Sequence, residues 1–197
     1  MRVAGYIRQT SPSWRPLSAW LLVVGVSLLF LSLIFLAPVA AATNHQELAL
    51  SIYKPFGTLC HQLPERSFFI VGHKLAVCAR CTGLYIGFAL TALCYPLVRP
   101  LRLTTTPRPR WLFLAAVPMA IDFSLTLLGV WQNTHVSRLV TGLLLGGVAV
   151  PYVVPGFIEL SLRGSESAKS QHTQFTTPSV EAIAAASSDY SAPHRRI

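Results

Sequence analysis

The residues from Leu17 to Ala40, LSAWLLVVGVSLLFLSLIFLAPVA, decide the class of fold to which this chain belongs. The stretch is 24 residues long and holds no charged side chain. An α-helix rises about 1.5 Å per residue, so about 20 apolar residues cross the hydrocarbon core of a bilayer. The stretch therefore predicts a transmembrane helix.

The composition of the whole chain supports a membrane protein. Of its residues 52% are hydrophobic and only 12% are charged, whereas soluble domains carry about a quarter charged residues. The formal net charge is +9 at pH 7, but the basic residues lie in segments beside apolar runs, where attraction to lipid headgroups explains them. We therefore expect a lipid bilayer, and not a nucleic acid, as the partner of this charge.

Three further apolar runs follow, at residues 82–98, 111–130 and 139–160. The last contains Pro151 and Pro155, which remove backbone donors and are expected to kink the helix or end it early. We predict an all-α polytopic membrane protein with about four transmembrane helices. The expected organisation is a basic N-terminal tail (1–16), a first transmembrane helix (17–40), a Cys/His loop (41–81), transmembrane helices two to four (82–162) and a disordered C-terminal tail (163–197).

The first apolar run has an alternative interpretation as a cleaved signal peptide. Arg2, Arg8 and Arg15 resemble the basic start of such a peptide, and the small residues at 37–42 resemble a cleavage site. The apolar run is longer than the usual ~7–15 residues of a signal peptide. Its length favours a retained helix.

The distribution of lysine and arginine predicts the orientation of the chain. With the N-terminus inside, the inner segments hold 11 of these residues and the outer segments hold five. Basic residues favour the cytoplasmic side, so we expect both termini in the cytoplasm and the Cys/His loop outside the plasma (inner) membrane. Four of the five outer basic residues lie in that loop itself and oppose this assignment.

The Cys/His loop carries the candidate site. Cys60, His61, Cys78 and Cys81 lie within 22 positions of one another. Between them, two β-prone runs flank Gly72-His73, which predicts a hairpin with Val71 opposite Lys74 and brings both later cysteines back towards Cys60. Three thiols and an imidazole are a tetrahedral zinc set. We therefore predict a soft metal such as zinc, bound by Cys60, His61, Cys78 and Cys81, with residues 45–59 as a helix on the membrane surface.

Two other hypotheses for the role of these cysteines stay open. Cys81 lies near the start of a helix and next to Arg80, an environment that favours a thiolate and a redox-active Cys78/Cys81 pair. In an oxidising compartment the same residues can form a structural disulfide. Under that reading Asp122 is the working residue of a structural or small-solute transport protein.

Polar and small residues inside the apolar runs complete the set of candidates. Asp122 is the one acidic residue deep in a run, and burying its charge requires a partner, for which we expect Arg138. The second and fourth runs each begin Thr-Gly-Leu-x-x-Gly, and such glycines let helices approach closely. The packing glycines are Gly83, Gly87, Gly142 and Gly146. The same faces could instead join copies of the chain or another protein into an oligomer.

Motifs across the chain resemble a known family. The first motif runs from Cys60-His61-Gln62 through Pro64 to Phe68, and the second runs from Val77-Cys78-Ala79-Arg80-Cys81-Thr82-Gly83 to Gly87. The similarity extends over residues 50–160. These motifs are similar to those of a family of uncharacterised prokaryotic integral membrane proteins, catalogued as a predicted membrane protein with a domain of unknown function. The resemblance implies a small multi-span helical protein and names no substrate, cofactor or reaction.

The function expected from the residues is a metal-holding accessory or binding role. Its alternatives are a thiol-disulfide oxidoreductase and a structural or transport protein. Whether the chain is an enzyme is left open by the sequence.

Overall fold

The computed structural model describes residues 14–101, 103–130 and 132–176. Most of the predicted basic tail, residues 1–13, and residues 177–197 of the predicted disordered tail lie outside this description. The chain divides into one compact unit of residues 1–159 and a second of residues 160–197. The candidate site lies in the first.

Five α-helices account for most of the described chain: α1 (Trp14–Ala42), α2 (Gln46–Leu59), α3 (Ala79–Val98), α4 (Arg110–Leu127) and α5 (His135–Thr176). A 3₁₀ turn (η1, Pro64–Arg66) and two short strands, β1 (Phe69–Ile70) and β2 (His73–Lys74), connect α2 to α3. Four helices are long and apolar enough to cross a membrane, namely α1, α3, α4 and the His135–Leu162 part of α5. The prediction of an all-α membrane protein with four spans and a small hairpin between the first two is confirmed.

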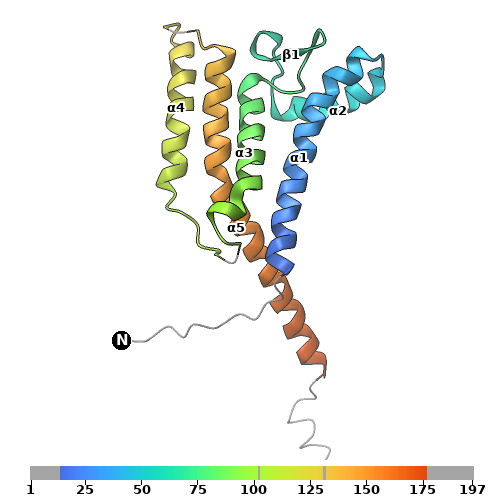
Figure 1. Ribbon diagram of the computed structural model, residues 1–197, viewed down its shortest axis with the longest axis vertical. Coiled ribbons are helices and arrows are strands. Elements are labelled where there is room, and N and C mark those ends of the chain that lie inside the picture. The colour runs from blue at the N-terminus through green and yellow to red at the C-terminus, as the bar shows by residue number, and fades with distance from the viewer. Residues whose placement is uncertain (1–13, 102, 131, 177–197) are drawn as a thin grey trace, which may run out of the picture. The chain divides into compact units, whose positions relative to one another are not determined.

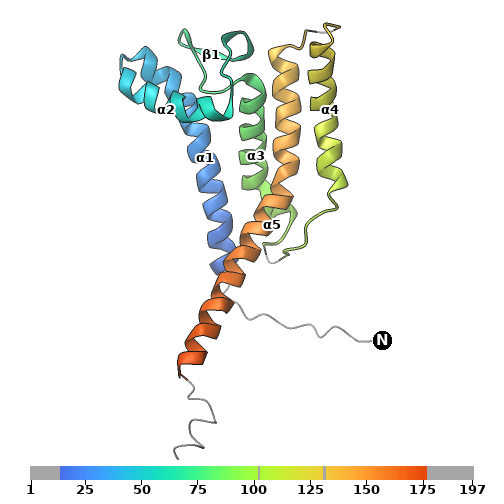
Figure 2. The ribbon, with the colours of Figure 1, turned by 180° about the vertical axis from the view of Figure 1, so that it is seen from behind.

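Within the first unit, α3 lies between α1 and α5, and α4 lies on the other side of α5 (Figures 1 and 2). The Trp20 indole of α1 donates a hydrogen bond to the Ala92 carbonyl of α3 at 2.8 Å, and Phe30 stacks on Tyr85 with ring centroids 6.0 Å apart. The helix α2 and the hairpin lie at the end of α1 and α3 where α3 begins. This arrangement places the Cys/His loop over one end of the helices.

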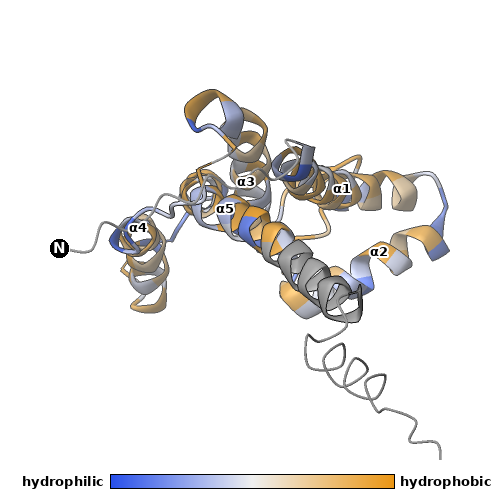
Figure 3. Ribbon diagram, turned by 90° about the horizontal axis from the view of Figure 1, so that it is seen from below, coloured by the Kyte–Doolittle hydropathy of each residue, from blue (hydrophilic) through white to orange (hydrophobic). Residues whose placement is uncertain are grey.

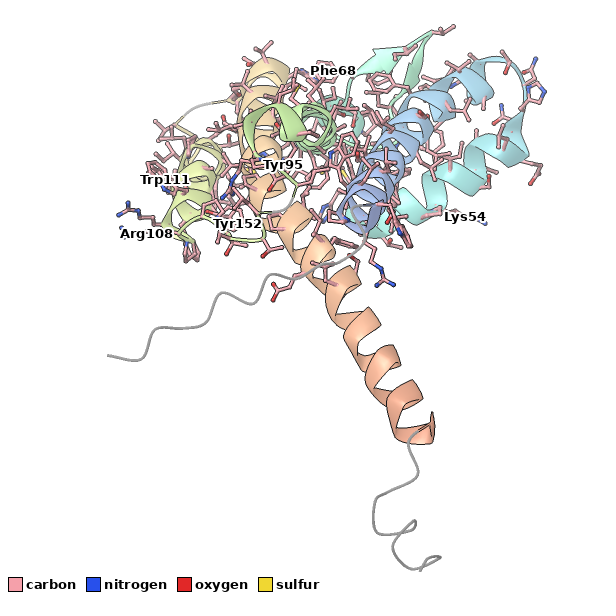
Figure 4. The ribbon with its side chains drawn as sticks, turned by 60° about the horizontal axis from the view of Figure 1, so that its bottom comes forward. Lys54, Phe68, Tyr95, Arg108, Trp111 and Tyr152 are labelled. Carbon is pink, nitrogen blue, oxygen red and sulfur yellow. The ribbon has the colours of Figure 1, made fainter. Side chains whose placement is uncertain are left out.

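At the opposite end, the α3–α4 connection is tied to α5. The Tyr152 hydroxyl of α5 donates a hydrogen bond to the Arg108 carbonyl at 2.8 Å, and Figure 4 shows both residues at that end, near Trp111. Otherwise α4 buries little, since Ala115 and Asp122 are its only buried residues. Most of the remaining residues of α4 are apolar (Figure 3), as suits contact with lipid.

Four glycines bring α3 and α5 together. A side chain on Gly83 or Gly87 would collide with the backbone carbonyl of Leu139 or Leu143, and one on Gly142 or Gly146 with that of Arg80 or Leu84. Small residues permit such close backbone contact in membranes. These glycines already pack α3 against α5 within one chain, so an oligomer would need another face. That the chain forms an oligomer stays a prediction.

This packing makes a specific prediction for Gly146→Ala. The added methyl meets the Leu84 carbonyl, so α3 and α5 must separate, and we expect a loss of about 1–3 kcal/mol of stability. Gly156→Ala, in the same helix, is the matched control because nothing lies within 4 Å of its Cβ position. Thermal unfolding of both variants in one detergent measures the difference; equal midpoints would contradict the close contact.

The hairpin differs from the predicted one by its register. Ile70 pairs with His73 and Phe69 with Lys74, so the turn residues are Val71 and Gly72, and the predicted Val71–Lys74 pair is wrong. Both turn residues have positive φ, 49° and 75°, as a type I′ turn requires. The observed register buries the run Leu75, Ala76 and Val77 in the core, each at most 1% exposed, and this burial outweighs the turn preference of valine.

The turn therefore stores strain that a substitution can release. A β-branched residue in the left-handed region costs about 1–2 kcal/mol, whereas asparagine tolerates that region. Val71 is 71% exposed and loses no packing when replaced. We expect Val71→Asn to stabilise the protein by about 1 kcal/mol in chemical unfolding. Val71→Thr keeps the β-branch and should give no gain; an equal gain there would refute the strain.

Prolines do not end the helices that contain them. Pro55 lies inside α2, because both Pro55 and Ser51, whose carbonyl loses its donor, lie on the exposed side. Likewise α5 passes through Pro151 and Pro155 and continues to Thr176, beyond the predicted end at residue 160 and into the predicted disordered tail. Extending an existing helix is easier than starting one.

Candidate metal centre

Three cysteines meet where α2 ends and α3 begins. Their Sγ atoms, on Cys60, Cys78 and Cys81, all lie within 4.8 Å of one another, and we call them the thiol cluster. Cys60 follows α2 and is 7% exposed, while Cys78 is the N-cap of α3 and Cys81 lies in its first turn. The Cys-x-x-Cys spacing places two thiols on one side of a helix start, and the hairpin returns them to Cys60.

The surroundings of the cluster favour a negative charge. The Cys78 backbone N–H donates to the Cys60 Sγ at 3.2 Å, and the start of α3 carries the positive end of the helix dipole. Hydrogen bonds from the Cys60 and Cys81 thiols lower the pKa of the Cys78 thiol, although burial acts against this. A thiolate is the form of cysteine that binds a metal or attacks as a nucleophile.

No disulfide links these residues. All four cysteines lie in the described part of the chain and are free thiols, so the expectation of a structural disulfide is not supported. The fourth, Cys94, is exposed and lies further along α3. The cluster is therefore a set of three reduced sulfur donors.

His61 is not a member of the thiol cluster. Cys60 has an extended backbone (φ −143°, ψ 136°), and successive side chains of an extended chain point to opposite sides. Cys60 is consequently buried while His61 is exposed, although His61 still lines the cavity described below. His135, the histidine that begins α5, packs against Phe68 with ring centroids 5.5 Å apart.

Gln62 and Lys74 brace the loop that carries Cys60. The Gln62 amide donates hydrogen bonds to the carbonyls of Tyr53 and Ala76, each at 2.8 Å. The Lys74 ammonium donates to the Gln62 carbonyl at 2.7 Å. These bonds join α2, the turn after Cys60 and the hairpin, and they fix the position of the cysteine between them.

A polar network lies next to the cluster, between α3, α4 and α5. The Arg80 guanidinium pairs with the Asp122 carboxylate at 2.7 Å, with side chains 23% and 9% exposed. The Asn133 amide also donates to Asp122 at 2.7 Å, and the Asn133 oxygen accepts two hydrogen bonds from Arg138, at 2.9 and 2.6 Å. We call Arg80, Asp122, Asn133 and Arg138 the polar network.

The network corrects the predicted partner of Asp122. Among the described residues the carboxylate pairs with Arg80, and Arg138 is linked to it only through Asn133. In the sequence Arg80 stands out only as a charge beside Cys81, and no motif marks Asn133. The one signal for Arg80 is its position one residue before Cys81, at the start of the same span.

The thiol cluster and three members of the polar network, Arg80, Asn133 and Arg138, line a cavity of about 560 Å³. Its polar lining comes from the three cysteines, His61, Gln62, Arg66, Arg80, Thr126, Asn133 and Arg138. Its apolar lining is Leu59, Leu63, Phe123 and Leu127. A ligand inside this space can touch sulfur and guanidinium groups together.

Comparison with known sequences places the chain in a family. Residues 60–153 match the family described as "Predicted membrane protein (DUF2085)". An uncharacterized protein of Methanocaldococcus jannaschii is 36% identical over 146 residues, which cover 72% of this chain and 94% of that protein. The chain belongs to this family. The matched region begins at Cys60 and includes the whole thiol cluster and polar network.

A second similar protein comes from another archaeon. An uncharacterized protein of Methanothermobacter thermautotrophicus is 40% identical over 96 residues, which cover 48% of this chain and 85% of that protein. No solved structure matches the chain. Membership of this family of predicted membrane proteins, together with the four helices that are long and apolar enough to cross a membrane, indicates a multi-pass membrane protein and assigns no activity.

Proposed function

We propose that this membrane protein holds a soft metal ion, such as Zn²⁺, on Cys60, Cys78 and Cys81. The observation that carries the proposal is the convergence of three free thiols from two distant segments within 4.8 Å. A tetrahedral zinc with Zn–S bonds of about 2.3 Å needs sulfur atoms about 3.8 Å apart. Small side-chain rotations bring the cluster to that spacing.

The role that fits this donor set is binding or transfer rather than a closed structural site. Structural zinc has four protein ligands, whereas sites with three protein ligands keep a position for water or substrate. The cluster offers three sulfur atoms and borders the 560 Å³ cavity. The fourth ligand is then a water, an exchangeable molecule or His61 after a local rearrangement.

A second function has support from one specific observation. The Sγ atoms of Cys78 and Cys81 lie within 4.8 Å of each other at the start of α3, where the helix dipole favours a thiolate. Hydrogen bonds from the neighbouring thiols also lower the pKa of Cys78, and a thiolate beside a second thiol suits dithiol–disulfide exchange. In this alternative Cys78 and Cys81 form and break a disulfide with a redox partner. The apolar contacts around Cys60 then serve only to position the pair.

Metal analysis and thiol counting on one sample separate the two functions. Protein purified anaerobically in detergent should contain about one metal ion per chain, with the cluster thiols unreactive until a chelator is added. Metal-free protein with two thiols that disappear and return with the redox potential would favour the oxidoreductase. Metal-free protein with all thiols reduced at every potential would refute both.

We also propose that the thiol cluster faces the outside of the plasma membrane, with both termini in the cytoplasm. The support is the count of 11 inner against five outer basic residues. A green fluorescent protein fused after Ile197 should fluoresce, because it folds in the cytoplasm. A dark fusion, together with an active alkaline phosphatase fusion at the same position, would reverse the orientation.

A further inference from the structure

The cavity beside the thiol cluster is lined by three arginines from three separate segments. Arg66 ends the 3₁₀ turn, Arg80 lies in the first turn of α3, and Arg138 lies in the first turn of α5. The charges of Arg66 and Arg80 both act on Arg138. Three guanidinium groups thus repel one another around one space.

Carboxylates supply little of the negative charge around these three arginines. The negative charges of Asp122 and of the Cys78 thiolate also act on Arg138. No aspartate or glutamate is among the residues that line the cavity. Arg66 has only Glu65, at 4.0 Å and with both side chains about half exposed or more, an arrangement worth little. Arg138 bonds to a neutral amide and makes no ion pair within the described part of the chain. Arg80 alone has a close carboxylate, Asp122.

Arg80 also keeps an unused donor. Its Nε is buried and has no hydrogen-bond partner among the described residues. A buried donor without an acceptor is costly, so an acceptor that reached this atom after a local movement of the Arg80 side chain would be stabilised. The positive ends of the α3 and α5 dipoles lie at the same end of the helices (Figure 1), and helix starts favour anions.

We propose that this cavity binds a phosphate group through Arg66, Arg80 and Arg138. Guanidinium groups bind phosphate oxygens through paired, charge-assisted hydrogen bonds. Three guanidinium groups match the three free oxygens of a phosphate group better than they match the two oxygens of a carboxylate. The cavity exceeds the size of a free phosphate, and its lining also includes an apolar wall formed by residues such as Leu63, Phe123 and Leu127. The phosphate therefore comes either free from solution or on a phospholipid headgroup whose chains continue along that wall.

Binding of inorganic phosphate and of phosphatidylglycerol to the full chain in detergent tests this proposal. Titration calorimetry measures the first, and native mass spectrometry counts retained molecules of the second. Arg138→Gln removes one guanidinium group from the cavity. Arg66→Gln removes another, and Arg66 lies in an exposed turn outside the polar network. Arg110→Gln is the matched control, since Arg110 is exposed at the start of α4 and contacts Trp111 instead.

We expect Arg138→Gln and Arg66→Gln each to weaken binding at least tenfold, because each loses charged hydrogen bonds, while Arg110→Gln binds like the wild type. Arginine-dependent binding of inorganic phosphate would identify a free phosphate as ligand. Arginine-dependent retention of phosphatidylglycerol alone would identify a lipid headgroup. If neither probe binds, the proposal is wrong. It is also wrong if Arg110→Gln lowers the affinity as much as Arg138→Gln and Arg66→Gln do.

Discussion

Cys78→Ser is expected to weaken metal binding at least a hundredfold and to lower the thermal stability of the metal-loaded protein. Apparent zinc affinities of about 10–16 kcal/mol are shared among four ligands, so one thiolate contributes about 3 kcal/mol or more. Serine keeps the size of the side chain but is a poor ligand for a soft metal. Competition with a coloured chelator measures the affinity, and unfolding with and without metal measures the linked stability.

Cys94→Ser is the matched control for this prediction. Cys94 is an exposed free thiol of the same helix, and 13 residues of helix separate it from Cys81 by about 20 Å. It should leave the affinity unchanged. If Cys78→Ser retains metal as well as Cys94→Ser does, the cluster is not the binding site.

Asp122→Ala is expected to destabilise the protein by about 3–5 kcal/mol, the usual cost of breaking a buried ion pair. The substitution leaves the Arg80 guanidinium and the Asn133 amide without their shared acceptor. It also removes one of only two buried residues of α4. We therefore expect α4 to loosen before the other helices, which protease cleavage within the α3–α4 or α4–α5 connection would detect.

The double variant Arg80→Gln/Asp122→Ala separates an ion pair from simple packing. Without the arginine no buried charge is left alone, so the double variant should be more stable than Asp122→Ala by at least 1 kcal/mol. Additive losses in the double variant would show that the carboxylate acts through packing and not through the charge of Arg80.

The four spans could be predicted because the length and hydrophobicity that a transmembrane helix requires can be read along the sequence alone. A bilayer demands about 20 apolar residues wherever a helix crosses it, and residues 17–40 satisfy that demand without reference to the rest of the chain. The close contact of α3 and α5 was likewise visible as two glycine pairs at helical spacing. The end of α5 could not be predicted from the sequence, because the residues after Leu160 carry no apolar pattern and extend a helix that is already formed.

The site was only partly predictable. The Cys-x-x-Cys spacing and the hairpin bring Cys78 and Cys81 towards Cys60, since both effects are local. The partner of Asp122 depends on how α3, α4 and α5 are rotated about their axes. Arg80 and Arg138 are both candidates to pair with Asp122. In the packed structure Arg80 binds the carboxylate, whereas Arg138 binds the amide oxygen of Asn133. The hairpin register depended in the same way on the burial of Leu75 to Val77.

X-ray absorption at the zinc edge of the zinc-loaded chain tests the central claim most directly, because it counts sulfur neighbours of the metal. We expect three sulfur atoms at about 2.3 Å and one lighter ligand, with two sulfur atoms left in Cys78→Ser and no change in Cys94→Ser. A shell of nitrogen and oxygen alone, or the same sulfur count in Cys78→Ser, would contradict a metal centre built on Cys60, Cys78 and Cys81.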